Sequence, residues 1–332
     1  MWEGEPARVS PRALHLLLVA RWLAGAPALG SDPTCPGLLE LAEQEGTLGI
    51  IAAMLPGDPA RRQRQAGYWG RGLWQMAFLE RLGSRLEQQD LEVIALKGAA
   101  LIPTAYVDPL LRPMGDLDLL VGSRDLQRVQ SLLESFGPDR PQVDLHTELL
   151  DTRRIPSRRL LGPPTGALWA DSRPWRPGLR LLSEEHQLLH LSLHALKHSC
   201  CRLIWLVDLA LALRCCPPAR IPLNSRPVLF CAHLVTELFP CSAPLVQLPP
   251  LAWSERMFLR VAARRRPGPI WGELFLAASL PGLSARLRYL VEYGFLGDEV
   301  VSAGGPRLRL AAAWRRFWRF VTNPRRNRGD AA

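Results

Sequence analysis

Apolar residues recur at helical spacing through the first ninety positions of the chain. Leu14, Leu18 and Trp22 share one face of a predicted helix over residues 10–24, with Ser10 as N-cap and Pro11 at the first helical position. Two more helices are expected over residues 38–54 and 59–89, the second long and amphipathic. We therefore expect residues 1–90 to form a helical layer that packs beside a central sheet.

Between residues 91 and 150 the pattern changes to short apolar runs separated by turns. Strands are predicted at 93–96, at the run that carries Asp116 and Asp118, and at 142–146. A brief helix after Lys97 and Gly98, and another from Ser123 to about Phe136, separate these strands. The order strand, helix, strand, helix, strand predicts a compact α/β unit.

The second half of the chain reads as mostly helical. Residues 151–182 are rich in Pro, Gly and Arg with little periodicity, which predicts a long connection. A helical domain is expected over 183–322, opening with a segment at 184–213 that is interrupted near Cys200. Shorter helices follow at 228–239, 252–266, 271–279, 283–296 and 308–321, before a disordered tail at 323–332. Together the pattern predicts the α+β class.

Composition adds a preference for anionic partners. The 332 residues are 48% hydrophobic and carry a formal net charge of +10, which indicates a globular protein that favours a nucleotide or another polyanion. Only Lys97 and Lys197 among the 41 basic residues are lysines. Because arginine is so strongly preferred elsewhere, these two positions indicate a need for a compact ammonium group.

Cysteine spacing and apolar run length predict the compartment. The seven cysteines include the doublets Cys200–Cys201 and Cys215–Cys216, which lack the spacing of a zinc ribbon and indicate buried thiols in a reducing environment. The segment 14–29 imitates a signal peptide, but Arg21 interrupts it, so we interpret it as an amphipathic helix. No run reaches the roughly 18 apolar residues that a membrane span needs, and a cytoplasmic location is expected.

Paired carboxylates are the first candidate chemistry. Asp116 and Asp118 are two apart on a predicted strand, so both point to one face while Leu117 and Leu119 point to the core. Like charges held this close favour a cation between them, although a solvated strand end would also tolerate them. Asp144 on the next strand supplies a third acid, and His146 shares its face.

These acids follow a turn suited to a phosphate. Gly98 lets backbone amides approach closely, and Lys97 or Arg112 would neutralise a triphosphate. Two metal ions need a bridging acid and an acid that can accept a proton from an attacking hydroxyl. Asp116 and Asp118 would hold both ions, with Asp144 on the ion that activates the acceptor. The arrangement predicts phosphoryl or nucleotidyl transfer.

Four stretches carry a resemblance to a known family: LKGAAL, LRPMGDLDLLV, VDLH and LLHLSLHALKHSCCRLIWLVDLALAL. Together they resemble the uncharacterised nucleotidyltransferase family of bacteria, a branch of the polymerase-β-like superfamily. The resemblance implies a small polymerase-β-like α/β core with N-terminal helices and a mostly α-helical C-terminal half. It also implies transfer of a nucleoside monophosphate from an NTP, with ATP expected, using Mg²⁺ or Mn²⁺ on the metal-binding and catalytic residues Asp116, Asp118 and Asp144.

Two departures from the superfamily pattern leave a second hypothesis open. Its Gly-Ser pair is Gly98-Ala99 here, and 17 residues separate Gly98 from Asp116. The alternative is a catalytically degenerate module that binds a nucleotide or a protein partner of a biosynthetic or toxin-antitoxin operon. In the enzymatic interpretation the acceptor is open between a small molecule, a peptide and a protein.

A histidine stripe lies on the helix predicted at 184–213. It comprises His186, His190, His194 and His198, four residues apart, so neighbours share a face. The stripe is either a zinc site, which would make the protein a zinc hydrolase, or a polar helix face packed against the first domain or its site. We place Lys197, with His194 and His198, near the nucleotide. Asp208, within an apolar helix, is expected to pair with a buried arginine such as Arg202.

Arginines and aromatic residues alternate near the C-terminus, in PRLRLAAAWRRFWRFVTNPRRNR. Such a mixture suits nucleic acid or an anionic membrane surface. An amphipathic terminal helix that docks on the core gives the same pattern, and we adopt that interpretation, so nucleic acid is not the expected partner.

Overall fold

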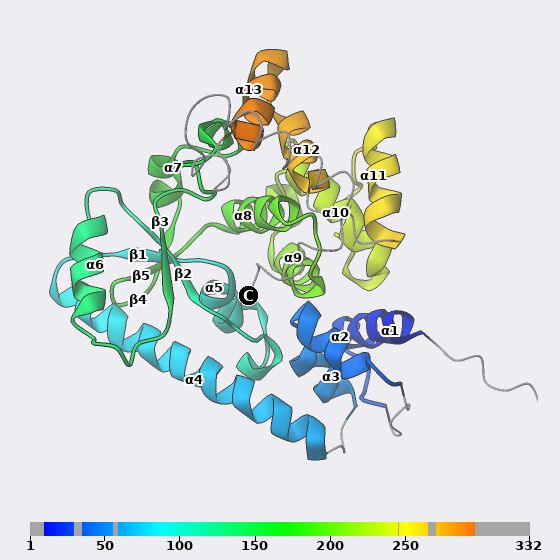
Figure 1. The fold of residues 1–332 in the computed structure, drawn as a ribbon, viewed down its shortest axis with the longest axis horizontal. Helices are drawn as coiled ribbons and strands as arrows, with labels where there is room; N and C mark the ends of the chain where they lie inside the picture. The colour runs from blue at the N-terminus through cyan, green and yellow to red at the C-terminus, as the bar shows by residue number, and fades with distance from the viewer. Residues whose placement is uncertain (1–9, 30–34, 56–58, 245, 265–269, 296–332) are drawn as a thin grey trace, which may run out of the picture.

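The protein is described by a computed structural model over residues 10–29, 35–55, 59–244, 246–264 and 270–295. Figure 1 shows a mixed sheet on one side and a group of helices on the other. The predicted α+β class is confirmed, with the sheet followed by a mostly helical C-terminal half. The helix predicted at 308–321 and the tail at 323–332 lie outside the described residues.

Five strands form the sheet, in the spatial order β3-β2-β1-β5-β4. β1 pairs antiparallel with β2 and parallel with β5, β2 pairs parallel with β3, and β4 pairs antiparallel with β5. The strands are β1 (Val93–Ala95), β2 (Leu117–Val121), β3 (Val143–His146), β4 (Arg173–Arg176) and β5 (Leu179–Leu181). The three strands predicted from the sequence are thus present, and two more were missed.

β4 and β5 lie in the segment 151–182, where the prediction of a plain connection is wrong. Leu179 and Leu181 are buried beside β1, while Arg and Pro at the intervening and flanking positions hide the alternation. The hairpin turns at Gly178, whose φ of 63° suits glycine. The same segment contains a 3₁₀ turn, η2 (Pro156–Leu161), and the short helix α7 (Thr165–Ala170).

Each face of the sheet has its own packing partner. Leu117, Leu119 and Val121 of β2 share a hydrophobic cluster with Phe78 and Leu82 of helix α4 (Pro59–Gln88) and with helix α6 (Leu126–Glu134). On the opposite face, Ile94 and Leu120 pack with Leu168 of α7. Because side chains alternate along β2, Asp118 lies on the same face as Leu120. α6 begins three residues later than predicted, since residues 123–125 form a turn and Asp125 is the N-cap.

We predicted a single helical layer beside the sheet from residues 1–90. The N-terminal helices instead divide between two places. Helices α1 (Pro11–Leu23), α2 (Leu38–Glu45) and α3 (Leu48–Met54) share the largest hydrophobic cluster with the C-terminal helices instead, while α4 runs along the sheet (Figure 1). The expected helix at 38–54 is divided because Gly46 has a φ of 72°, which ends α2. Ser10 caps α1 as predicted, accepting a hydrogen bond from the Ala13 amide at 3.2 Å.

The chain crosses between the two halves through helix α5 (Lys97–Ala105) and a 3₁₀ turn, η1 (Pro109–Leu111). After β5 it enters α8 (Glu184–Lys197) and α9 (Leu203–Cys215), with the predicted break confirmed at Ser199 and Cys200, both at φ 53°. The remaining elements are η3 (Pro218–Arg220), α10 (Arg226–Leu238), η4 (Pro240–Ser242), α11 (Trp253–Arg264), α12 (Ile270–Ser279) and α13 (Gly282–Phe295).

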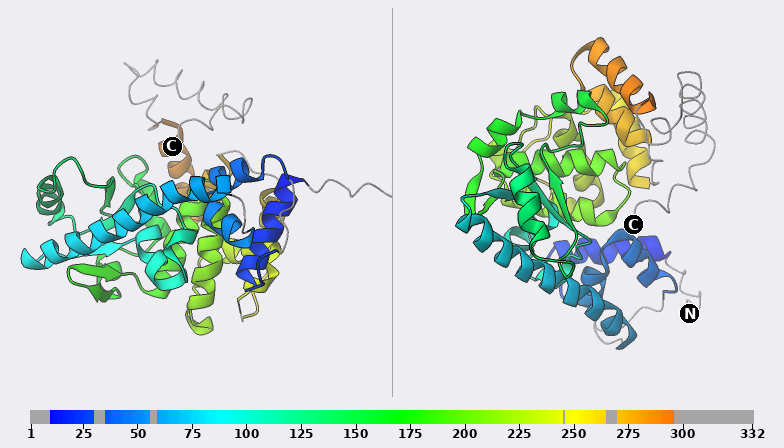
Figure 2. Two further views of the ribbon diagram at one scale, coloured as in Figure 1. Left: turned by 90° about the horizontal axis from the view of Figure 1, so that it is seen from below. Right: turned by 60° about the vertical axis from the view of Figure 1, so that its left-hand side comes forward.

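The two views of Figure 2 show the elements from other sides, and in the right-hand view α4 (cyan) and α13 (orange) lie at opposite ends of the molecule. Within the described ranges, every helix is too short or too polar to cross a lipid bilayer.

Candidate functional site

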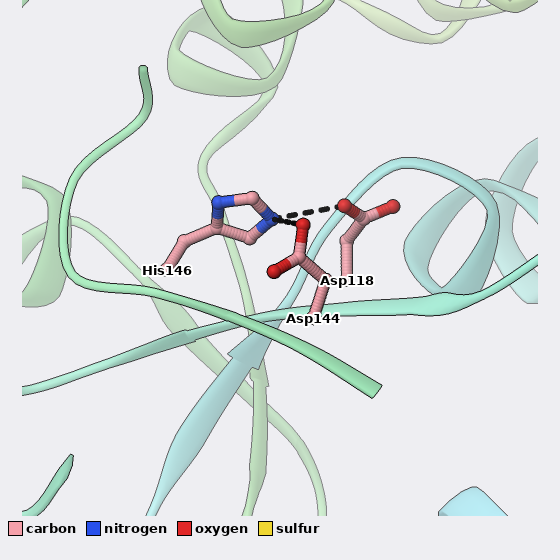
Figure 3. Close-up of side chains that lie close together, drawn as sticks. All are labelled: Asp118, Asp144 and His146. Atoms are coloured by element: carbon pink, nitrogen blue, oxygen red, sulfur yellow. Dashed lines mark hydrogen bonds and ion pairs between the residues drawn. The ribbon is translucent and has the colours of Figure 1, made fainter. Parts of the chain in front are cut away.

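Three side chains on two neighbouring strands form the closest group of potential metal ligands. The parallel register of β2 and β3 places Asp118 opposite Asp144, and Leu120 opposite His146. His146 Nε2 lies 2.9 Å from Asp118 Oδ1 and 3.3 Å from Asp144 Oδ2 (Figure 3). One ligand atom from each residue lies within 4.8 Å of the other two. Asp144 therefore lies on the same face as Asp118, as the strand pattern predicted.

Asp116 lies beside this group and not inside it. It precedes β2 by one residue and is half-buried, whereas Asp118 is 4% exposed. Burial raises the pKa of Asp116, and the negative charges of Asp118 and Asp144 raise it further. The predicted trio of acids is thus gathered in one place, but His146 completes the closest set.

His146 was the residue that sequence reasoning left without a role. Its position on the same strand face as Asp144 was visible in the alternation of VDLH. The contact to Asp118, however, depends on the parallel register of β3 with β2, which strand alternation alone does not fix.

Lys97 gives Asp118 a second partner. Its Nζ lies 2.5 Å from Asp118 Oδ1, the oxygen that also accepts from His146. Lys97 is the first residue of α5, separated from the end of β1 by Leu96, and has a φ of 45°, in the left-handed region that costs a side chain about 1 kcal/mol. This strained backbone turn holds the ammonium at the carboxylate.

These partners keep Asp118 ionised. Its burial alone would raise the pKa, but the hydrogen bond from His146 and the positive charge and hydrogen bond of Lys97 outweigh that effect and lower it to about 2. A carboxylate that stays charged at neutral pH is ready to hold a cation.

Arg112 has a structural partner of its own. Its Nε and Nη2 donate to Asp208 Oδ1 and Oδ2 at 2.8 and 2.7 Å, and the Tyr106 hydroxyl donates to Asp208 Oδ1 at 2.7 Å. The prediction that Asp208 pairs with a buried arginine is confirmed, but the arginine is Arg112 and not Arg202, whose Nε donates to the Gln44 carbonyl. Both members of the Arg112–Asp208 pair are buried, and the carboxylate raises the pKa of the guanidinium above its ordinary value even though burial lowers it.

Gly98 permits this arrangement. A Cβ at position 98 would overlap Arg112 Nη1 and lie 2.8 Å from Met114 Cγ and Sδ. The glycine thus lets the Arg112 and Met114 side chains lie directly over the start of α5.

A single cavity of about 740 Å³ joins these groups to the helical half. It is bounded by the ends of β2 and β3, the start of α5, one side of α8 and the start of α9, and the turn between α2 and α3. All seven residues predicted for the site line it, namely Lys97, Gly98, Arg112, Asp116, Asp118, Asp144 and Lys197.

The α8 wall carries three of the four histidines of the predicted stripe. His190, His194 and His198 line the cavity, whereas His186 is not among its lining residues and has its Nε2 3.9 Å from Asp171 Oδ2. Burial lowers the pKa of His190 and His198 to about 3 and that of His194 well below its ordinary value. In the part of the chain that the structure describes, the stripe forms no group of three ligand atoms that could share one metal.

Lys197 also lines the cavity and adds an ammonium group to it. It forms no hydrogen bond or ion pair with the residues that the structure describes, and burial and the charge of Arg158 lower its pKa. The site thus combines acids, two lysines and five arginines around one cavity, the arginines being Arg71, Arg112, Arg153, Arg154 and Arg202.

The donor set suits a divalent cation. Carboxylate oxygens are the preferred ligands of Mg²⁺, and an added imidazole is also compatible with Mn²⁺. Asp118 and Asp144 would hold the ion, with Asp116 and His146 adjacent.

Comparison with known proteins gave one family match. A family model described as "Uncharacterised nucleotidyltransferase" matches residues 38–140 and 138–218, more than half of the 332 residues. No curated protein and no solved structure matches the chain. The matched residues include β1 to β5, α8 and α9, and with them the acids, Lys97 and the histidine wall.

Proposed function

Because the chain belongs to the uncharacterised nucleotidyltransferase family, we propose that it transfers a nucleoside monophosphate from an NTP, with ATP as the expected donor, to an acceptor. The observation that carries the proposal is the convergence of Asp118, Asp144 and His146 on one wall of a cavity whose other walls supply lysines. Pyrophosphate is the second product.

The reaction makes one bond and breaks one. The acceptor oxygen attacks the α-phosphorus, the bond from that phosphorus to the bridging oxygen of the β-phosphate breaks, and pyrophosphate leaves. A bound Mg²⁺ or Mn²⁺ supplies charge neutralisation and orients the triphosphate. The acceptor proton passes to a carboxylate, for which Asp144 is the candidate, because it is the most exposed of the three acids.

The basic residues bind the phosphates. Lys197 is the clearest candidate, since it lines the cavity and forms no ion pair with the described residues. Lys97 reaches the cavity from the opposite wall. Arg112 also lines the cavity and contributes positive charge there, while two nitrogens of its guanidinium group donate to Asp208. These roles place the triphosphate between α5 and α8.

A second function is favoured by a specific observation. Ala99 follows Gly98, so the serine hydroxyl of the superfamily's Gly-Ser pair is absent. Lys97 already neutralises Asp118. A protein with these features would bind a nucleotide without transferring it. It would then serve as a partner-binding module of a biosynthetic or toxin-antitoxin operon.

Titration calorimetry separates these possibilities. We expect ATP with Mg²⁺ to bind the wild type, and Asp118→Asn to weaken that binding at least tenfold by removing the buried carboxylate charge. Asp139→Asn, an exposed acid in the turn before β3, is the matched control and should bind as the wild type does. Equal binding by Asp118→Asn and the wild type would contradict the metal site.

Turnover is then tested with α-labelled NTPs and a pool of candidate acceptors. Transfer of label with release of pyrophosphate supports the enzyme, and its loss in Asp118→Asn links it to this site. Binding without transfer in any pool supports the alternative function.

A further inference from the structure

Three aromatic rings cluster on the cavity wall where α8 meets α9. The ring centroids of His194 and His198 are 4.9 Å apart, and each lies 5.0 Å from the ring of Trp205. All three residues line the cavity and are half-buried, so part of each faces that space. We call these three residues the ring cluster.

The ring cluster lies at the end of the cavity away from the acids. Lys97 acts on the pKa of all three cavity histidines, but Asp118 and His146 act on that of His190, whereas Lys197, Arg158 and Arg202 act on that of His198. The 1.5 Å rise per residue of an α-helix puts His198 roughly 12 Å farther along α8 than His190.

The far end is closed by the turn between α2 and α3. A Cβ at Gly46 would lie 2.9 Å from Ile204 Cγ2 and 3.0 Å from Arg202 Nη2, so this turn packs tightly on the start of α9. Arg202 also lies over the Trp205 ring, with its Cζ 5.8 Å from the ring centroid. The ring cluster is therefore a fixed wall and not a loose surface.

The chemistry of this wall differs from that of the rest of the cavity. Burial lowers the pKa of His194 and His198, so their rings are neutral at physiological pH. Neutral rings offer no charge to a phosphate, but they present flat π surfaces. Stacking on such surfaces binds every nucleobase, because each base has a π face.

We propose that the ring cluster of His194, His198 and Trp205 binds the planar base of the nucleotide substrate, while the acids and lysines bind its phosphates. The inference rests on the proposed function, since it assigns one part of the same cavity to one part of an NTP. It adds a base-binding subsite, with Trp205 as its largest ring.

The test compares two ligands that share their phosphates. ATP and inorganic tripolyphosphate are each titrated, with Mg²⁺, into the full-length wild type. Stacking of one base on aromatic side chains is worth roughly 5- to 150-fold in affinity, so ATP should bind about tenfold or more tightly than tripolyphosphate. Equal affinity for the two ligands would overturn the base subsite and leave the phosphate site standing.

Substitutions locate the effect. Trp205→Ala should weaken ATP binding about tenfold with tripolyphosphate binding unchanged, and Trp205→Phe should keep most of the ATP affinity because it keeps a ring. Trp253→Ala, at an exposed position of α11, is the control and should change neither ligand. A Trp205→Ala protein that loses both ligands equally contradicts the inference.

The wild-type comparison needs no substitution, so equal affinity for the two ligands overturns the base subsite even where Trp205→Ala does not fold. If neither ligand binds the wild type, the proposed function fails, and the base subsite fails with it.

Discussion

At the scale of single residues, Asp118 is the point on which the site depends. One of its oxygens accepts from both Lys97 and His146, and this pairing keeps a 96% buried carboxylate charged. The sequence was enough to find Lys97 and the acids, because their residue types and spacing carry that information. It was not enough to assign His146, because only the pairing of β3 with β2 brings its ring to Asp118.

His190 makes the stability of the metal-free protein depend on pH. Burial lowers its pKa from 6.5 to about 3, so below pH 6.5 the unfolded chain takes up a proton that the folded chain does not. The contribution of the neutral His190 ring to the free energy of unfolding is complete above pH 6.5, and it is lost progressively as the pH falls toward 3. We expect a loss of roughly 2 kcal/mol from this residue between pH 7 and pH 5.

Urea unfolding at the two pH values measures this loss. His190→Leu removes the titrating ring, so its free energy of unfolding should fall less between pH 7 and pH 5 than that of the wild type. His233→Leu on α10 serves as the control for substitution of a histidine. The same fall in His190→Leu and the wild type would show that this ring does not set the dependence.

At the scale of elements, segments with a clear apolar pattern were predictable and segments that arginine and proline interrupt were not. The helices α1, α4 and α8 were found within a few residues, because each repeats its apolar face over several turns. β4 and β5 were missed because β4 reads Arg-Pro-Trp-Arg and because Arg180 separates the only two apolar residues of β5. The division of α2 from α3 depends on one glycine with a positive φ, which periodicity does not reveal.

Close packing of α12 on α8 gives a prediction at this scale. A Cβ at Gly272 would overlap the Leu196 carbonyl oxygen and lie 2.9 Å from the Ser199 amide nitrogen. Because both obstacles are backbone atoms, Gly272→Ala must push the helices apart, and we expect it to lower the free energy of unfolding by roughly 1–3 kcal/mol.

Gly166→Ala in α7 is the matched control for chemical denaturation. Nothing lies within 4 Å of a Cβ there, so this change should be neutral or stabilise the protein by up to about 1 kcal/mol. A Gly272→Ala protein as stable as the control would show that the two helices are not in rigid contact.

At the scale of the whole molecule, buried charge joins the two halves of the chain. Arg112 follows η1 and Asp208 lies in α9, 96 residues later, with Tyr106 as a third member. The sequence showed that Asp208 needs a buried arginine but not which one, since that choice depends on how α9 packs against α5. The same packing sets the cavity between the halves.

A double-mutant cycle measures this connection. Removing one partner leaves a buried charge unpaired, so Arg112→Met and Asp208→Leu should each lower the free energy of unfolding by roughly 3–5 kcal/mol. The double variant should lose much less free energy of unfolding than the two single variants lose together, because neither buried charge remains. If the loss in the double variant equals the sum of the two single losses, the two side chains act independently.

The contact between Lys97 and Asp118 bears on how the protein matures. An internal ammonium balances the most buried acid of the site, so the nascent chain can complete its fold while no divalent ion is at hand. Under the proposed function, metal loading is then a later and reversible exchange, in which an incoming ion takes the place of the lysine on that oxygen. A chelator should therefore strip the protein without unfolding it, and the stripped form should bind the ion again when Mg²⁺ is added back in excess of the chelator.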